Sequence, residues 1–301
     1  MNSEEISLIK LIRGFNAPLA AAADISPCLM RLDGVRAVLC DVYGTMLASS
    51  ANGLSDNYSC PDLPAAFRES LRSLGVEIDP AAAVAGVNRF NAVLAGEQDR
   101  LKKQGIAYPE VDVRTIWKQT LAGLSRNAKR FPALNGRKIS RLAVEYENRI
   151  NPAWPMPGLE ETLCALAAAG VQLGIVSNAQ FYTPLALTAL LGEKWRSWFK
   201  PSLCFWSYEH REAKPGPELY QRALAALEKS CGIKPPEAVM IGNSIANDVR
   251  PALACGCRAV LFAGDRRACR LSPDDRRRIS SRRWPVITGW PQLMKIIVPG
   301  P

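Results

Sequence analysis

Residues 35–47 read V-R-A-V-L-C-D-V-Y-G-T-M-L, and this stretch decides the fold that we predict. The run 37–40 is short, apolar and rich in branched residues, which is typical of a strand buried on both faces. Asp41 follows directly and would stand at the carboxyl end of that strand, where open α/β sheets border their ligand crevice. Gly44 allows a sharp turn, and Thr45 can donate a hydroxyl hydrogen bond to the carboxylate or to a bound anion. Taken alone, the stretch is equally compatible with a strand that ends in an ordinary polar turn.

Beyond this stretch the chain separates into a helical block and a block of alternating helices and strands. Apolar spacing and capping signals predict helices over 64–74, 80–105, 111–125 and 139–150. After Gly158 they predict strands over 171–176, 203–206, 238–241 and 259–262, with helices between them and a last strand and helix over 286–297. Strands that alternate with helices form parallel sheets with helices on both faces. We therefore predict an α/β fold, a Rossmann-like doubly wound parallel sheet with an inserted all-helical domain.

Proline-rich segments at 60–64 and 151–158 bracket the helical block, and we expect them to be its hinges. The predicted division is a helical extension over 1–33, an α/β core over 34–49 and 152–301, and a helical insertion over 50–151. Residues 4–23 predict an amphipathic helix that packs on the body or on another copy of the chain. A homodimer is therefore one of the arrangements that we consider.

Composition excludes several classes of protein. No run approaches the roughly 18 to 20 apolar residues that a membrane span requires, and acids among the first five residues do not fit a secretory signal. We therefore expect a cytoplasmic protein with no membrane partner. Nine cysteines without a C-x-x-C pattern fit reduced thiols. The single histidine, His210, excludes a multi-histidine metal site, and no G-x-S-x-G sequence accompanies it.

The net charge of +10 is unevenly distributed. Segment 265–283 holds eight arginines against three aspartates, a local balance of +5 that is half of the total. Nucleic-acid surfaces usually interleave aromatic residues with such bases or place the bases on one helix face, and here Trp284 is the only aromatic neighbour. The pattern favours a solvated loop over a surface that binds nucleic acid or an acidic partner.

Polar residues stand at four predicted junctions between a strand and the next helix. They are Asp41 with Thr45, Ser177 with Asn178, Lys214, and Asn243 with Asp248. Because the carboxyl ends of parallel strands lie along one edge of a sheet, we expect these residues to converge in one crevice. A carboxylate nucleophile, a hydroxyl, an ammonium and a second carboxylate suit displacement at an electrophilic centre. Lys214 and Ser177 would hold the anion, and Asp248 would anchor Lys214 or bind a cation.

Four short motifs resemble, in this order, those of the haloacid dehalogenase (HAD) superfamily of aspartate-nucleophile hydrolases. They are D-V-Y-G-T at 41–45, V-S-N at 176–178, K-P at 214–215 and G-N-S-I-A-N-D at 242–248. The helical insertion stands where such proteins carry their cap domain. The resemblance implies that Asp41 attacks the substrate and forms a covalent ester or acyl-phosphate, which water then hydrolyses.

The resemblance also implies roles for the other motif residues. Ser177 would bind the transferred group and Lys214 would stabilise its negative charge, while Thr45 and Asn178 join the catalytic candidates as members of the same motifs. A Mg²⁺ ion would be held by Asp41, Asn243, Asp248 and the backbone carbonyl of Tyr43.

Two departures from the phosphatase pattern leave the subclass open. HAD phosphatases carry a second aspartate two residues after the nucleophile, which protonates the leaving oxygen, and this chain has Tyr43 there. Their fourth motif usually places a Mg²⁺-binding aspartate where this chain has Asn243, whose neutral amide weakens the site without abolishing it. Loss of a proton donor typically costs on the order of 10² to 10⁴ in rate when the leaving group is poor.

Tyr43 is instead the residue found in haloacid dehalogenases, whose halide leaving group needs neither a proton nor a metal. Tyr220, six residues after Lys214, also fits their spacing, so Tyr43 and Tyr220 are candidate substrate-binding residues. The fourth motif does not match, because dehalogenases place a serine and an asparagine five and three residues before the acid, where this chain has Asn243 and Ile245.

The leading hypothesis is a HAD-type hydrolase of a small anionic substrate, with a slight preference for phosphate esters or acyl-phosphates. A 2-haloacid dehalogenase that needs no metal is the alternative, and a third hypothesis is a binding or regulatory protein that has kept the fold and lost efficient catalysis. Within the insertion, residues 108–112 are polar and aromatic enough to face the crevice. For Ile116 and Trp117 we favour ordinary helix packing.

Overall fold

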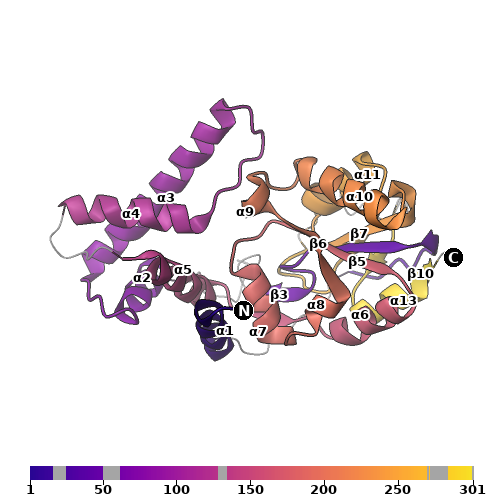
Figure 1. Cartoon of the computed structure of the whole chain (residues 1–301), viewed down its shortest axis with the longest axis horizontal. Coiled ribbons are helices and arrows are strands. Elements are labelled where there is room, and N and C mark those ends of the chain that lie inside the picture. Colours follow the sequence, from indigo (N-terminus) through magenta and orange to yellow (C-terminus); the bar gives the residue numbers. More distant parts are fainter. Residues whose placement is uncertain (16–24, 50–61, 128–133, 270, 272–283, 300–301) are drawn as a thin grey trace.

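The computed structural model describes residues 1–15, 25–49, 62–127, 134–269, 271 and 284–299. Its main element is a sheet of six parallel strands in the order β6-β5-β2-β7-β8-β9 (Figure 1). In that order the strands are Phe199–Trp206, Gln172–Ser177, Ala37–Cys40, Ala238–Gly242, Arg258–Phe262 and Val286–Ile287. The predicted α/β fold is confirmed, and the strand that leads into Asp41 lies in the middle of the sheet.

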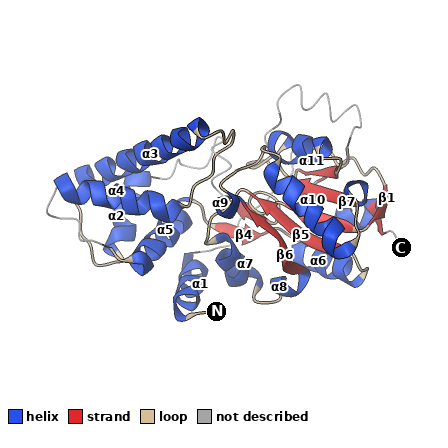
Figure 2. Ribbon diagram, turned by 45° about the horizontal axis from the view of Figure 1, so that its top comes forward, coloured by secondary structure: helices blue, strands red, loops and turns tan. Residues whose placement is uncertain are grey.

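Helices cover both faces of this sheet (Figure 2). One face packs against α6 (Leu159–Ala168), α7 (Thr183–Leu191) and α13 (Leu293–Ile296), and the other against α10 (Glu218–Cys231) and α11 (Arg250–Ala254). In β2, Val38 and Cys40 belong to the first hydrophobic cluster, while Ala37 and Leu39 belong to the second. A strand in which every residue is apolar can be buried only between two layers, which explains the central position of β2.

Shorter elements complete the fold. They are β1 (Leu32–Val35) paired in parallel with β10 (Ile297–Pro299), β3 (Leu47–Ser49) paired antiparallel with β4 (Ala153–Pro155), the short helices α8 (Trp195–Trp198) and α9 (Ser207–His210), the 3₁₀ helices η1 (Pro235–Glu237) and η3 (Trp290–Gln292), and the π-helix η2 (Ile245–Val249). Cys28 also pairs with Val286 of β9. The segment 25–33 therefore contacts the core, although the sequence analysis assigns it to an amino-terminal extension.

Four helices that lie between β3 and β4 in the chain pack around a hydrophobic cluster of their own, beside the sheet (Figure 1). They are α2 (Leu63–Arg72), α3 (Pro80–Lys103), α4 (Val113–Asn127) and α5 (Gly136–Ile150), and we call them the cap. Trp117 stacks on Phe67 with 5.2 Å between ring centroids inside this cluster, which confirms its packing role. The cap surrounds its own core, as expected for an insertion, and the boundaries at residues 33, 49 and 151 stay predictions.

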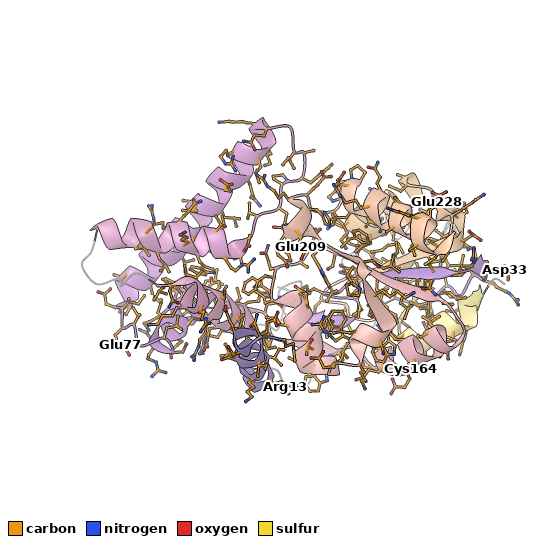
Figure 3. All side chains as sticks on the ribbon, in the orientation of Figure 1. Arg13, Asp33, Glu77, Cys164, Glu209 and Glu228 are labelled. Carbon is orange, nitrogen blue, oxygen red and sulfur yellow. The ribbon has the colours of Figure 1, made fainter. Side chains whose placement is uncertain are left out.

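The amino-terminal helix α1 (Ser3–Phe15) contacts both the cap and the sheet layer. Its buried apolar residues lie between α5 and α7, and they are Leu8, Ile9 and Ile12. Arg13, labelled in Figure 3, donates a hydrogen bond from Nε to the carbonyl oxygen of Ala189 in α7 at 3.0 Å. The sequence predicts this helix over 4–23, and its alanine run after residue 15 lies outside the described residues.

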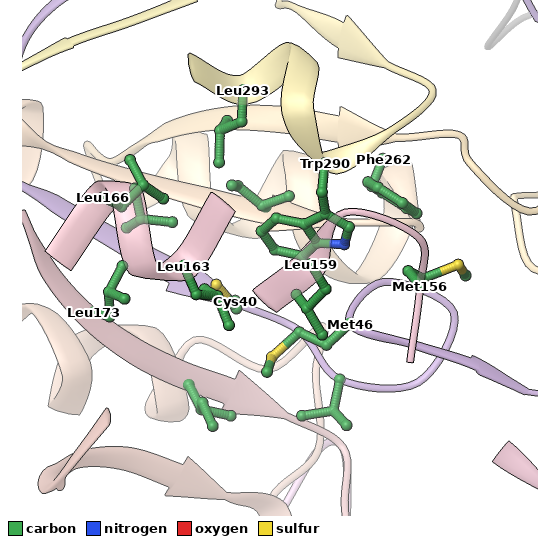
Figure 4. Close-up of a cluster of buried hydrophobic side chains, with 14 of the residues drawn as sticks. Cys40, Met46, Met156, Leu159, Leu163, Leu166, Leu173, Phe262, Trp290 and Leu293 are labelled. Atoms are coloured by element: carbon green, nitrogen blue, oxygen red, sulfur yellow. The ribbon is translucent and has the colours of Figure 1, made fainter. Parts of the chain in front are cut away.

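The core beneath β2 supports the loop that follows Asp41 (Figure 4). Met46 from this loop and Trp290 lie in the same buried cluster as the leucines of α6. Trp290 also donates a hydrogen bond from Nε1 to the carbonyl oxygen of Thr45 at 2.9 Å. The loop after Asp41 is therefore held by both apolar packing and a buried hydrogen bond.

Two expectations from the sequence concern the surface. In the part of the chain that the structure describes, no helix is both long and apolar enough to cross a membrane. Most of the arginine-rich segment 265–283 lies outside the described residues. In its described part, Arg267 Nη2 forms an ion pair with Asp265 Oδ2 at 2.6 Å.

Candidate active site

The four polar junctions meet around Asp41 at the carboxyl ends of the central strands. Ser177 Oγ donates a hydrogen bond to Asp41 Oδ1 at 3.0 Å, and Lys214 Nζ donates to the same oxygen at 2.7 Å. Thr45 Oγ1 lies 3.3 Å from Asp41 Oδ2. Asp41 is only 6% exposed, and the three donors are buried as well. The structure therefore brings together residues that are far apart in the sequence, as the motifs predict.

Lys214 lies between two carboxylates. Its Nζ is 2.5 Å from Asp248 Oδ1 as well as 2.7 Å from Asp41 Oδ1. Burial acts to lower the pKa of Lys214, but the charges of Asp248 and Asp41 outweigh it and raise the pKa above its usual value. Burial raises the pKa of Asp248 to about 6, although Lys214 acts in the opposite direction. With both carboxylates ionised, one ammonium balances one of two negative charges, so the cluster retains a net charge of −1.

Asn178 contacts the backbone of Lys214, and none of its described contacts is with Asp41. The amide nitrogen of Lys214 donates to Asn178 Oδ1 at 2.7 Å, and Asn178 Nδ2 donates to the carbonyl oxygen of Lys214 at 3.1 Å. This reciprocal pair fixes the main chain from which the lysine side chain projects. We therefore assign Asn178 a positioning role, which its motif alone does not reveal.

Two glycines allow the main chain to approach the site closely. Gly44 has a φ of 82°, and a Cβ there would lie 2.7 Å from Ala268 Cβ and 2.9 Å from Asn243 Nδ2. A Cβ on Gly242 would lie 2.2 Å from Asp248 Cγ. Because neither gap can hold a methyl group, these two positions require glycine if Asn243 and Asp248 are to keep their places.

The side-chain oxygen atoms near Asp41 are suitable ligands for a hard divalent cation such as Mg²⁺. Asn243 Nδ2 donates to the carbonyl oxygen of Ala268 at 3.0 Å, so its Oδ1 faces the loop after Asp41, where Thr45 Oγ1 donates to it at 3.1 Å. Carboxylate and amide oxygens are the ligands that Mg²⁺ accepts, and the net negative charge of the cluster favours a cation. Among the described residues, no group of three or more His, Cys, Asp or Glu is placed to hold a metal. A cation here would therefore depend on Asp41, Asp248 and the amide of Asn243.

A cavity of about 600 Å³ opens between the strand ends and the cap. We call one group of lining residues, Asp41, Lys214, Asn243 and Asp248, the nucleophile side. We call a second group, Glu110, Glu147, Gln180 and Tyr182, the acidic side. The volume suits a small ligand of the size of a phosphate ester.

Glu110 of the acidic side lies in the segment 108–112 that the sequence places at the crevice. Its Oε2 accepts a hydrogen bond from Ser207 Oγ at 2.9 Å. Its Oε1 accepts from the amide nitrogen of Val111 at 3.0 Å and from Gln180 Nε2 at 3.2 Å. All of these donors are neutral, and burial raises the pKa of Glu110 above its ordinary value.

Glu147 on α5 is a site residue that the sequence analysis misses. Its Oε1 accepts a hydrogen bond from Asn151 Nδ2 at 2.8 Å, and its carboxylate is also hydrogen-bonded to the hydroxyl of Tyr182. Burial raises the pKa of Glu147, and these two neutral donors only partly oppose the rise. No local signal identifies this residue, because an amphipathic helix carries several polar residues and their sequence does not show which one meets a cavity.

The structure separates the two tyrosines that the sequence proposes as substrate contacts. Tyr43 lines the cavity, and its hydroxyl lies 3.2 Å from Thr183 Oγ1. Tyr220 is fully buried in the cluster between the sheet and α10, where its hydroxyl donates to the carbonyl oxygen of Asn247 at 2.6 Å. Tyr220 is not among the residues that line the cavity, so the proposed substrate contact is corrected to a supporting contact with the main chain of η2.

Comparison with curated proteins finds phosphatases. The chain is 24% identical over 176 residues to glyceraldehyde 3-phosphate phosphatase of Pyrococcus furiosus, a match that covers 50% of this chain and 65% of that protein. It is 26% identical over 233 residues to phosphoglycolate phosphatase of Salmonella typhi, covering 76% of this chain and 82% of that protein. The chain thus spans just under two thirds of the first relative and most of the second.

A solved structure that is named for a different activity shares the fold of this chain. The 2-haloacid dehalogenase from Pseudomonas syringae pv. Tomato DC3000 superposes with a TM-score of 0.58 at 16% identity, covering 87% of this chain and 97% of that chain. The model of the haloacid dehalogenase-like hydrolase family matches residues 35–256, which include every motif residue described above. The chain therefore belongs to the haloacid dehalogenase-like hydrolase family.

Proposed function

We propose that this protein is a Mg²⁺-dependent phosphatase that hydrolyses small phosphate esters or acyl-phosphates, with Asp41 as the nucleophile. The observation that carries the proposal is the buried cluster in which Lys214 contacts both Asp41 and Asp248, while the amide oxygen of Asn243 faces the same loop. A dehalogenase has no use for a cation at this place. The two relatives named as phosphatases support the same choice.

In the first step an oxygen of Asp41 would form a bond to phosphorus while the bond between phosphorus and the leaving oxygen breaks. Lys214 and Ser177, which already contact Asp41, would donate hydrogen bonds to the phosphoryl oxygens as charge develops on them. When bound, Mg²⁺ supplies positive charge that offsets the charge of the phosphoryl group. In the second step water attacks phosphorus, phosphate leaves and the Asp41 carboxylate is regenerated.

Tyr43 determines which leaving groups this site can accept. Burial raises the pKa of its phenol, and the neighbouring Glu147 charge acts in the same direction. The phenol is therefore a weak acid, and it would not replace the aspartate that protonates the leaving oxygen in other phosphatases. Esters and acyl-phosphates whose leaving oxygen needs no proton should react fastest.

The experiment that tests this function compares two substrates on the full chain, with Mg²⁺ and with a chelator. We expect p-nitrophenyl phosphate to release phosphate with Mg²⁺ and to stop when Mg²⁺ is chelated, while 2-chloropropionate releases no chloride. Chloride release that is insensitive to the chelator would replace the phosphatase by the dehalogenase. No turnover of either compound by folded protein would favour the binding or regulatory protein.

A further inference from the structure

We propose that the organic part of the substrate carries a positive charge, an ammonium group, and that Glu110 and Glu147 recognise it. The proposal rests on the phosphatase function and names the substrate class within it. The substrate would be a phosphate monoester whose phosphate lies on the nucleophile side of the cavity and whose ammonium group lies on the acidic side.

The charges that line the cavity are unequally balanced. Among the described residues, they are the carboxylates of Asp41, Asp248, Glu110 and Glu147 and the single ammonium of Lys214. Lys214 already contacts Asp41 and Asp248. The described contacts of Glu110 and Glu147 are all with neutral donors, so among the described residues no lysine or arginine pairs with either carboxylate.

A half-buried carboxylate that has only neutral partners is less stable than one paired with a cation. Burial raises the pKa of both Glu110 and Glu147, so a cation held between them would favour their ionised forms. An organic part with a negative charge would instead meet two carboxylates, and no counterion from the described part of the chain. This chain therefore suits a different organic group from the carboxylate of phosphoglycolate.

The surroundings of these carboxylates suit an organic cation better than a second metal ion. No third His, Cys, Asp or Glu joins them to form a metal-binding group within the described chain. The aromatic side chains of Tyr43 and Tyr182 line the same cavity, and aromatic faces attract ammonium groups. Gln180 donates a hydrogen bond to Glu110, and the hydroxyl of Tyr182, two residues further along, is hydrogen-bonded to Glu147, so both carboxylates contact the same short segment of the chain.

The test measures kcat/KM of the full chain with Mg²⁺ for three alkyl phosphates of similar size. They are 2-aminoethyl phosphate, n-propyl phosphate and carboxymethyl phosphate, whose organic parts are cationic, neutral and anionic. All three should react slowly because Tyr43 does not protonate their leaving oxygen, so the test compares the ratios between them. We expect the cationic ester to exceed the neutral one by about tenfold and the anionic one by about a hundredfold. Equal or higher kcat/KM for the anionic ester would overturn the proposal. If the same preparation hydrolyses p-nitrophenyl phosphate, such an outcome overturns the proposed substrate class and leaves the phosphatase function intact. If it does not hydrolyse p-nitrophenyl phosphate, the phosphatase function itself fails.

Variants connect the preference to the two carboxylates. Glu110→Gln and Glu147→Gln should each lower the ratio of kcat/KM for 2-aminoethyl phosphate to that for n-propyl phosphate by about threefold, because the two carboxylates share the roughly tenfold preference. Glu209→Gln removes the same charge from an exposed position on α9 that does not line the cavity, and it should keep the wild-type ratio (Figure 3). A wild-type ratio in both cavity variants, each shown to be folded by thermal unfolding, would overturn the proposal. Because Glu110 lies in a loop and Glu147 in a helix, one variant remains informative if the other fails to fold.

Discussion

The two sides of the cavity contain equal numbers of carboxylates and balance them differently. On the nucleophile side, Lys214 forms ion pairs with Asp41 and Asp248. On the acidic side, Glu110 and Glu147 have only neutral hydrogen-bond donors among the described residues. The first arrangement holds its charges in place before any ligand arrives, whereas the second becomes balanced only when a ligand supplies a cation. Under the proposed function, the difference separates the residues that would perform the chemistry from those that would select the substrate.

The carboxylates of the two sides also come from different parts of the fold. Asp41 and Asp248 lie beyond the carboxyl ends of β2 and β7, whereas Glu147 lies in α5 of the cap and Glu110 in the loop between α3 and α4. Substitutions can therefore change one side and leave the other in place. The predictions below use this separation, from the largest expected effect to the smallest.

Asp41→Asn removes the nucleophile while it keeps the shape of the side chain. We expect turnover of p-nitrophenyl phosphate to fall by on the order of 10⁴-fold or more, because no covalent intermediate can form. Asp33→Asn, an exposed position in β1 at the far end of the sheet (Figure 3), is the matched control and should keep wild-type turnover. Appreciable turnover in Asp41→Asn would contradict the assignment of the nucleophile.

Lys214→Met makes the nucleophile side resemble the acidic side, because it leaves two buried carboxylates without a cation. Breaking a buried ion pair in this way typically costs about 3 to 5 kcal/mol of unfolding free energy. Urea denaturation measures the loss, and millimolar Mg²⁺ should restore part of it by replacing the missing charge. An unchanged midpoint without Mg²⁺ would show that Lys214 does not balance this cluster.

Tyr43→Asp introduces a carboxyl group that can protonate a leaving oxygen. We expect kcat for n-propyl phosphate to rise by on the order of 10- to 10²-fold, with a smaller change for p-nitrophenyl phosphate, whose leaving group needs no proton. Tyr43→Phe controls for loss of the hydroxyl that lies near Thr183 and should show no such rise. An equal change with both substrates would contradict the proposed defect in proton donation.

Glu147→Gln tests the acidic side through stability, where we expect the smallest effect. Burial raises the folded-state pKa of Glu147 above its ordinary value of 4.5, so its ionisation disfavours the folded state as the pH rises. This contribution is absent below pH 4.5, where the carboxyl is protonated in both states. The melting temperature of Glu147→Gln relative to that of the wild type should therefore rise between pH 4 and 8. A constant difference over this range would show that the carboxylate is not disfavoured in the folded chain.

The sequence predicts the nucleophile side well because each of its motifs is a contiguous stretch at the end of a strand. The alternation of helices and strands then determines that these ends meet, and the structure places Asp41, Ser177, Lys214 and Asp248 together. The acidic side requires knowledge of how the cap sits on the sheet. Glu110 lies in a segment with a recognisable polar pattern, but only the packing of α5 determines that Glu147 faces the cavity.

Two further differences have the same physical origin. The spacing of Tyr220 suggests a substrate contact, but helical periodicity places its ring in the core between α10 and the sheet, where only its hydroxyl reaches η2. The pairing of β1 with β10 joins segments separated by more than 250 positions, which local patterns do not reveal. Spacing along a chain thus identifies residues that share an element and says less about which elements meet.

The position of α1 limits the freedom of the cap. The cap is connected to the core through β3 and β4, which pair with each other. A domain that is joined through two adjacent strands can rotate about a single hinge axis that runs through them. The contacts of α1 with both α5 and α7 join the cap to the core at a third place, away from that hinge axis. A wide rotation would have to expose Leu8, Ile9 and Ile12, at about 1.5 to 3 kcal/mol for each side chain. The contacts of α1 therefore oppose a wide rotation of the cap, and we expect a substrate to enter by way of smaller movements while α1 stays in place.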